Sequence, residues 1–158
     1  MPKVDRLLLV AATIIAAVGP ISAAEASVIT DKLRGQWAGS GTLKLANGKN
    51  ERIRCHGNAS GGETSLSQFF TCASTANNFS FSTSLAFSGS KVSGDWFGPE
   101  GGGTASGSAS SSSMSLSLVS SNGRGRLSAT FSSCRLSLTV TGWSTELRSL
   151  SVRMRKPC

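Results

Sequence analysis

The stretch Phe79-Ser80-Phe81-Ser82-Thr83-Ser84-Leu85-Ala86-Phe87 decides the fold. Large apolar side chains occupy most of the alternate positions, and small, mostly polar side chains stand between them. This period of two indicates a β-strand with one buried and one solvated face, because successive side chains of a strand point to opposite sides. A helix would need apolar residues three and four positions apart, and this stretch does not offer that spacing.

The same alternation recurs along most of the chain. It is clear at 114–118, at 136–140 and at 150–154. The pairs Asn47-Gly48 and Asn122-Gly123 favour tight hairpin turns between such runs, since both residue types tolerate positive φ angles. The sequence therefore predicts about ten short strands, at 36–46, 50–58, 66–74, 78–88, 91–97, 103–109, 112–120, 124–132, 134–141 and 147–155.

Strands joined by short turns pair with their chain neighbours in antiparallel fashion, and a meander this long most simply closes on itself. We predict an all-β fold, a single antiparallel up-and-down barrel of eight to ten strands, with a two-sheet sandwich as the alternative. Residues 101–113 offer little to bury, so we interpret them as a flexible loop or a poorly held strand; the alternative is a place where small side chains leave room inside the barrel. Residues 27–34 are expected to form a short helical lid or a trailing arm, capped by Thr30 and ended by Gly35.

The N-terminus has the features of an export signal. Basic residues precede an apolar run at 7–18, and small residues follow it. The run, about a dozen residues long, is shorter than the roughly 20 residues that cross a bilayer. We therefore predict a signal peptide over 1–26, cleaved near Glu25 or Ser27, a β-barrel domain over 27–158, and a periplasmic or secreted location.

The chain holds four cysteines, Cys55, Cys72, Cys134 and Cys158. An even number of cysteines in an exported chain indicates disulfide bonds. Three pairings are possible; Cys55 with Cys72 is the local choice, which leaves Cys134 with Cys158. No Cys-x-x-Cys spacing occurs and His56 is the single histidine. Neither a metal nor a cofactor is therefore expected.

The chain is basic, with a formal net charge of +8. Such a charge favours binding to anions, including lipid headgroups and cell-envelope polymers. Nucleic acid is not expected as a partner, because export removes it and the basic residues do not interleave with stacking aromatics. A membrane-spanning barrel is disfavoured too, since the chain lacks an aromatic girdle. Several arginines alternate out of phase with the apolar positions and are expected on one wet outer wall, namely Arg52, Arg54, Arg124, Arg126, Arg135, Arg153 and Arg155.

No group of residues indicates catalysis. Nucleophilic hydrolysis needs a base beside Ser or Cys, and the alternation of the strand points His56 toward water. The chain contains no Gly-x-Ser-x-Gly elbow, and no two carboxylates stand out as an acid and base pair. We therefore expect a protein that is not an enzyme. We also expect it to be a monomer.

The first predicted strand opens with Gly35-Gln36-Trp37-Ala38-Gly39-Ser40-Gly41-Thr42. Its Gly-x-Trp start resembles the first strand of the lipocalin-like (calycin) barrels. In that family an arginine near the last strand stacks on the tryptophan. Arg148, Arg153 and Arg155 are candidates for that role by location, and no local motif selects one of them.

The longer pattern, which adds residues 51–55 and 72–74, also resembles uncharacterised exported small β-barrel proteins of alphaproteobacteria. That resemblance covers most of the chain after the predicted signal peptide and implies a fold without an activity.

The expected function is that of an exported, non-enzymatic binding protein that holds a small apolar ligand inside the barrel. The alternative is an envelope-interaction or protease-inhibitor-like module with a packed barrel and a rigid protruding segment, near the N-terminus or at 99–103. The partner is then an apolar ligand or an anionic envelope component. The candidate residues that line a ligand cavity are Trp37, Phe79, Phe81, Leu85, Phe87 and Leu116.

Overall fold

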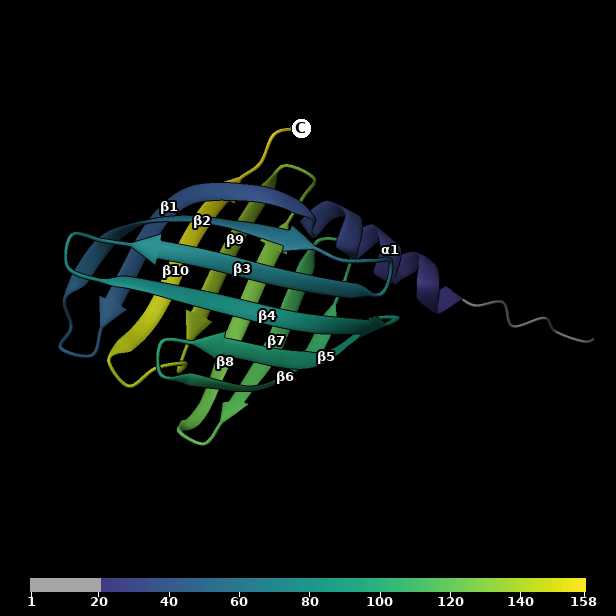
Figure 1. The fold of residues 1–158 in the computed structure, drawn as a ribbon. Helices are drawn as coiled ribbons and strands as arrows, with labels where there is room; N and C mark the ends of the chain where they lie inside the picture. The colour runs from purple at the N-terminus through teal and green to yellow at the C-terminus, as the bar shows by residue number, and fades with distance from the viewer. Residues whose placement is uncertain (1–20) are drawn as a thin grey trace, which may run out of the picture.

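The computed structural model describes residues 21–158, and the side chains from residue 24 onward. One helix precedes ten strands that form a closed antiparallel barrel in chain order, with the first strand also hydrogen-bonded to the last (Figure 1). The elements are α1 (Ile21–Leu33), β1 (Gly35–Leu45), β2 (Asn50–Ser60), β3 (Ser65–Ala73), β4 (Asn78–Ser88), β5 (Lys91–Gly98), β6 (Gly101–Ala109), β7 (Ser113–Ser120), β8 (Gly123–Phe131), β9 (Arg135–Thr141) and β10 (Leu147–Arg155). The predicted barrel is thus confirmed, and the sandwich alternative is excluded.

The glycine- and serine-rich stretch forms the strand predicted at 103–109, so the flexible-loop interpretation of 101–113 is wrong for this part. Residues 101–109 form β6, a full strand paired with both β5 and β7, instead of a flexible loop. The strand needs no large side chains, because its backbone groups are satisfied by two neighbours. At Gly103 and Gly107 an added Cβ would meet backbone atoms of β7, so the small residues allow the two strands to lie close together.

The inner face of the barrel is packed. Apolar side chains from all ten strands form one buried cluster, and none of them is more than 7% exposed. The two disulfides join Cys55 to Cys72, which face each other across β2 and β3, and Cys134 to Cys158. These are the pairs expected from sequence. Among residues 21–158, no helix is long and apolar enough to cross a membrane.

Two glycines let β1 curve against β10. An added Cβ at Gly39 would meet the carbonyl oxygen of Arg153, and one at Gly41 would meet the carbonyl oxygen of Ser151. A side chain at either position would therefore push the closing pair of strands apart, since the contact is with backbone that cannot rotate away. The closure of the barrel depends on these two positions having no side chain.

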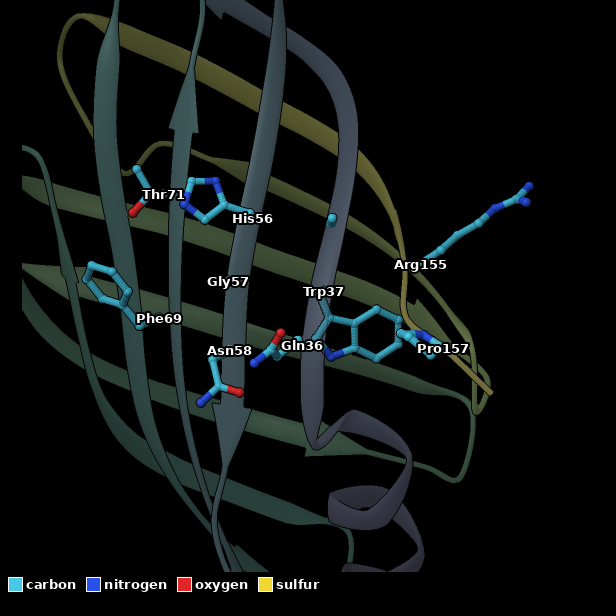
Figure 2. A pocket seen from close by; sticks show the side chains of 10 residues that line it. Gln36, Trp37, His56, Gly57, Asn58, Phe69, Thr71, Arg155 and Pro157 are labelled. Atoms are coloured by element: carbon cyan, nitrogen blue, oxygen red, sulfur yellow. The ribbon is translucent and has the colours of Figure 1, made fainter.

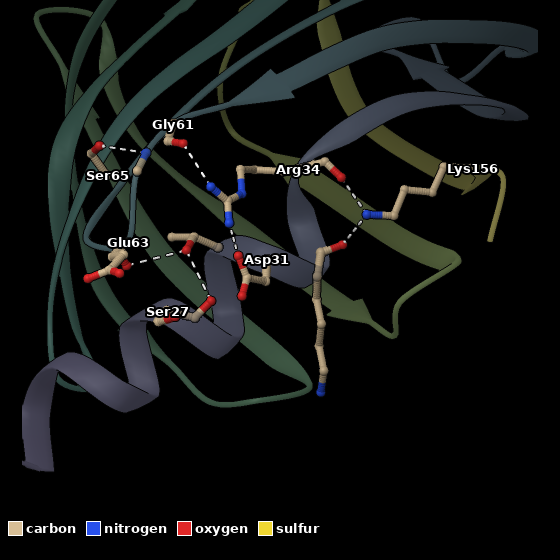
Figure 3. Close-up of polar contacts among 10 residues, drawn as sticks. Ser27, Asp31, Arg34, Gly61, Glu63, Ser65 and Lys156 are labelled. Atoms are coloured by element: carbon tan, nitrogen blue, oxygen red, sulfur yellow. Dashed lines mark hydrogen bonds and ion pairs between the residues drawn. The ribbon is translucent and has the colours of Figure 1, made fainter.

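The helix α1 closes one end of the barrel. Its buried residues, Ala26, Ile29, Thr30 and Leu33, follow the spacing of a single helical face. The hydroxyl of Thr30 lies within hydrogen-bond distance of the carbonyl oxygens of Ser27, at 3.1 Å, and of Glu63, at 3.3 Å (Figure 3). The expected helix is confirmed, but it begins earlier than predicted. Thr30 lies inside it and does not cap it, because upstream residues extend the same apolar face.

The predicted signal peptide overlaps this helix. Residues 1–20 lie outside the described residues, whereas 21–26 form the first turns of α1. The predicted cleavage points near Glu25 and Ser27 therefore fall within the helix.

Glu100 joins two loops at the end of the barrel opposite α1. Its carboxylate accepts hydrogen bonds from the hydroxyl of Ser144, at 2.8 Å, and from the backbone N–H of Thr145, also at 2.8 Å. The hydroxyl of Thr145 and the backbone N–H of Glu146 donate to it as well. The β5–β6 turn is thereby bound to the β9–β10 loop, which holds Trp143 in the interior. These bonds, led by the one from the Thr145 backbone, lower the pKa of Glu100 to about 2.

Replacing Gly41 by alanine is expected to lower the free energy of unfolding by about 1–3 kcal/mol, the usual cost of forcing an extra group into a packed site. Urea denaturation of the oxidised protein measures the loss. The matched control is Gly62→Ala, where an added Cβ would meet only the hydroxyl oxygen of Ser65, at 3.5 Å. Equal stability of the two variants would contradict the close approach of β1 and β10.

The stabilising effect of Glu100 is expected to be lost at acid pH. Its pKa is lower in the folded protein than the ordinary value of 4.5, so its contribution is complete above pH 4.5 and is lost as the pH falls through about 2. Melting temperatures measured between pH 7 and pH 2 test this: Glu100→Gln lowers Tm at pH 7, and the deficit shrinks toward pH 2. Asp95→Asn, which removes an exposed carboxylate of β5, is the control. A deficit independent of pH would contradict the assignment.

Candidate functional site

The residues predicted to line a ligand cavity all lie in the barrel core. They are buried and face inward, as the alternation implied. None of the five principal pockets in the described part of the chain is lined by Phe79, Phe81, Leu85, Phe87 or Leu116. Trp37 alone borders one of these pockets. The core residues pack against one another, and the principal pockets lie elsewhere.

An aromatic cluster fills the interior at the Glu100 end of the barrel. The ring of Trp143 meets Phe79 and Phe81 edge to face, with centroids 5.3 and 5.6 Å apart, and Phe81 stacks on Trp96 at 6.1 Å. The indole N–H groups of Trp96 and Trp143 are buried, and neither has a hydrogen-bond partner in the described structure. Nearby on the inner wall, the Thr83 hydroxyl donates to the side-chain oxygen of Gln68 at 3.1 Å. The two indole N–H groups and the Thr83–Gln68 pair are thus polar groups inside an otherwise apolar core.

The outer wall carries a furrow that follows β1. Three of the principal pockets border this strand, with volumes of about 500, 450 and 480 Å³. The first borders Gln36 and Ala38, and the other two lie on either side of Ser40 and Thr42. Small side chains on β1 between longer ones on β2 and β10 create the furrow. From Gln36 to Thr42 it runs for roughly 20 Å, at about 3.3 Å per residue.

Strand pairing places basic side chains on both sides of this furrow. Ser40 lies between Arg54 of β2 and Arg153 of β10. In the neighbouring row, Ala38 lies between His56 and Arg155. All of these side chains are exposed. Since adjacent strands are about 4.8 Å apart, the two basic rows stand about 10 Å from each other across the furrow. Arg52 extends the β2 row next to Thr42.

The arginines beside the furrow are not neutralised. Among residues 21–158 the one ion pair joins Arg34 to Asp31, at the end of α1. Glu51, the carboxylate nearest to Arg52 in sequence, accepts hydrogen bonds from the hydroxyl of Ser74 at 2.5 Å and from the amide of Asn77 at 2.8 Å. These bonds, the Ser74 bond first, lower the pKa of Glu51. Its carboxylate is therefore held at the β3–β4 turn and forms no ion pair with the arginines of the furrow.

One end of the furrow reaches an exposed aromatic ring. Phe69 of β3 is 54% exposed and lines the first pocket together with polar groups of β1 and β2. Figure 2 shows these side chains arranged across the three strands, with Arg155 extending to the opposite side from Phe69. The polar residues of this pocket are Gln36, His56, Asn58, Thr71 and Arg155.

The largest principal pocket, about 660 Å³, lies between α1 and the β4–β5 and β6–β7 turns. Its lining includes Ala24, Glu25, Val28 and Ile29 of the helix. Two of these residues belong to the predicted signal peptide, so removal of that peptide would take away part of the wall. The furrow along β1 does not depend on processing, and we therefore take it as the candidate site. Among residues 21–158, no group of three or more His, Cys, Asp or Glu side chains is placed to hold a metal ion.

The cation above Trp37 differs from the expectation. The ammonium group of Lys156, and none of the three candidate arginines, lies 4.9 Å from the centre of the Trp37 ring. It also donates to the carbonyl oxygens of Lys32, at 2.7 Å, and of Arg34 (Figure 3). Trp37 in turn donates its indole N–H to the carbonyl oxygen of Leu33 at 2.8 Å. Both groups stabilise the C-terminal end of α1, where the helix dipole favours a cation. Burial lowers the pKa of Lys156, and the nearby charge of Arg34 adds to this effect.

Sequence reasoning placed the arginines on the outer wall but did not identify the furrow or Phe69. The furrow depends on the pairing of β1 with β10, which the residue pattern does not reveal. A signal for Phe69 was present: Phe69 and Phe70 are adjacent in a strand of period two, so one of the two rings must face outward. The same holds for Trp96 and Phe97, and Phe97 is 62% exposed.

No protein-family model matches this chain, and a search of curated proteins found no match. Among solved structures, that of Rv2717c from M. tuberculosis is similar, with a TM-score of 0.63 and 15% sequence identity over 84% of this chain and 98% of that one. A redesigned β-barrel is aligned at a TM-score of 0.44 and 12% identity, over 82% of this chain and 96% of its own. At 15% sequence identity, the similarity to Rv2717c shows a shared barrel fold and nothing further.

Proposed function

We propose that this protein is an exported, non-enzymatic binding module that holds a linear anionic polymer of the cell envelope along the β1 furrow. One observation carries the proposal: Arg54 and Arg153 face each other across Ser40, and neither is paired with a carboxylate in the described structure. Guanidinium groups match the geometry of carboxylates and phosphates, which can accept two parallel hydrogen bonds. A groove with basic rows on both sides suits a chain of such groups.

The barrel itself supports this use of the outer wall. Its interior is packed, α1 closes one end, and the Glu100 bonds tie the loops at the other end. The two disulfides fit an oxidising, extracytoplasmic location. The predicted signal peptide and the resemblance to exported small barrels of alphaproteobacteria agree with export. A rigid scaffold of this kind holds its arginines in place without a ligand, so little order has to be gained on binding.

A second candidate function is suggested by the unpartnered indole N–H groups of Trp96 and Trp143. A small apolar ligand with a hydrogen-bond acceptor would satisfy them, and a buried donor left without a partner costs about 1–3 kcal/mol. Such a ligand would have to enter past α1 or the Glu100 loops and displace part of the aromatic cluster.

Binding of inorganic polyphosphate tests the first function. Replacing Arg54 and Arg153 together by glutamine is expected to weaken binding and to lower the slope of log affinity against log salt by about 2, one for each lost contact. Titration calorimetry at several NaCl concentrations measures both. The matched control replaces Arg124 and Arg126 of β8, which removes the same charge three strands away. If the two double variants lose affinity equally, the attraction is diffuse and the furrow is not the site.

Native mass spectrometry of protein purified from its own host tests the second function. A bound small molecule that is released on denaturation, and that is lost from a Trp96→Phe variant, is the expected result. The Phe97→Ala variant, which is altered on the outer wall, is the control and is expected to keep the bound molecule until denaturation. Spectra of the native protein that show only the mass of the polypeptide would contradict an interior ligand.

A further inference from the structure

The exposed ring of Phe69 stands in a row with two amide side chains. Strand pairing places Gln36 beside Asn58, and Asn58 beside Phe69, on the outer faces of β1, β2 and β3. The same row continues to Ser82 and Phe97 on β4 and β5. Figure 2 shows the Gln36 and Asn58 side chains close to each other, with the Phe69 ring beyond them on the next strand. An aromatic face and two amides therefore border the same pocket.

Gly57 allows β2 to lie close to β3 beneath this pocket. An added Cβ at Gly57 would meet the carbonyl oxygen of Phe69 and the ring of Phe70. The strand can therefore carry His56 and Asn58 on its outer face while its backbone lies close to β3 at the residue between them. The outer pocket at this position has an apolar ring on one side and hydrogen-bonding groups on the other.

We propose that the polymer in the furrow is a glycan that carries carboxylate groups, with one sugar ring stacked on Phe69. This inference rests on the proposed function, because it specifies the occupant of the same furrow. The C–H face of a pyranose ring packs on an aromatic ring, and its hydroxyl groups can exchange hydrogen bonds with the amides of Gln36 and Asn58. The carboxylates of the following sugars then lie between the rows of Arg54 and Arg153.

Charge and composition both favour this occupant over other anions. The basic rows complement acid groups spaced along a chain. The floor of the furrow, Ala38, Ser40 and Thr42, is small and partly hydroxylated, which suits a polyol. A single-stranded nucleic acid would use several successive aromatic platforms, whereas Phe69 is the one exposed phenylalanine, tyrosine or tryptophan ring at this pocket in the described structure. A lipid surface would be met by a broad apolar patch, and Phe69 stands among polar groups.

The experiment compares oligogalacturonate with inorganic polyphosphate, which has charge but no sugar ring. Phe69→Ala is expected to weaken oligogalacturonate binding about tenfold, by analogy with the loss of one aromatic side chain on which a nucleic-acid base stacks, and to leave polyphosphate binding unchanged. Phe69→Tyr, which keeps the ring, retains the affinity. Phe97→Ala removes another exposed phenyl ring two strands away and is the matched control. Circular dichroism verifies that each variant is folded.

The outcomes separate the two proposals. If Phe69→Ala weakens both polymers equally, or neither of them, the glycan assignment is overturned while the polyanion function stands. Tighter binding of oligothymidylate, or of vesicles that contain phosphatidylglycerol, than of oligogalacturonate also overturns it. If the wild-type protein binds none of the polyanions, the proposed function itself fails.

Discussion

The pairing of β1 with β10 is the constraint on which the rest of this molecule depends. It converts a ten-strand meander into a closed sheet without free edges, so every strand finds two partners. The pairing requires the backbones of the two strands to approach closely, and Gly39 and Gly41 permit this because they have no Cβ to collide with the carbonyl groups of β10. The packed core, the furrow and the position of Trp37 over the barrel end all follow from this closure.

Residue alternation predicted the strands well, because inward and outward positions differ in side-chain type along most of the chain. In β4 and β7 large apolar groups alternate with serine, and both strands lie close to where the pattern puts them. The pattern was weakest where the side chains of the two faces do not differ in type. In β6 glycine, alanine and serine occupy both faces, and its pairing with β5 and β7 is a backbone property that composition does not show.

The candidate site was less accessible to sequence reasoning than the fold. Alternation indicated that Arg54 and Arg153 face outward, but they are about a hundred residues apart in the chain. The register of β1 with β2 places Arg54 next to Ser40, and the register of β1 with β10 places Arg153 on its other side. Likewise, Lys156 rather than an arginine reaches Trp37, because the chain beyond β10 turns toward the end of α1 and Cys158 is bonded to Cys134. Such contacts between sequence-distant segments are set by topology.

The two sides of the furrow come from opposite ends of the barrel sequence, β2 near its beginning and β10 at its end. The first half of the chain therefore carries only the β2 row of guanidinium groups. Both rows flank β1 only after β10 has paired with β1. Contacts this distant in sequence form late and slowly. Under the proposed function, a polymer that contacts both rows would bind the closed barrel and not a chain in which β10 has yet to pair with β1.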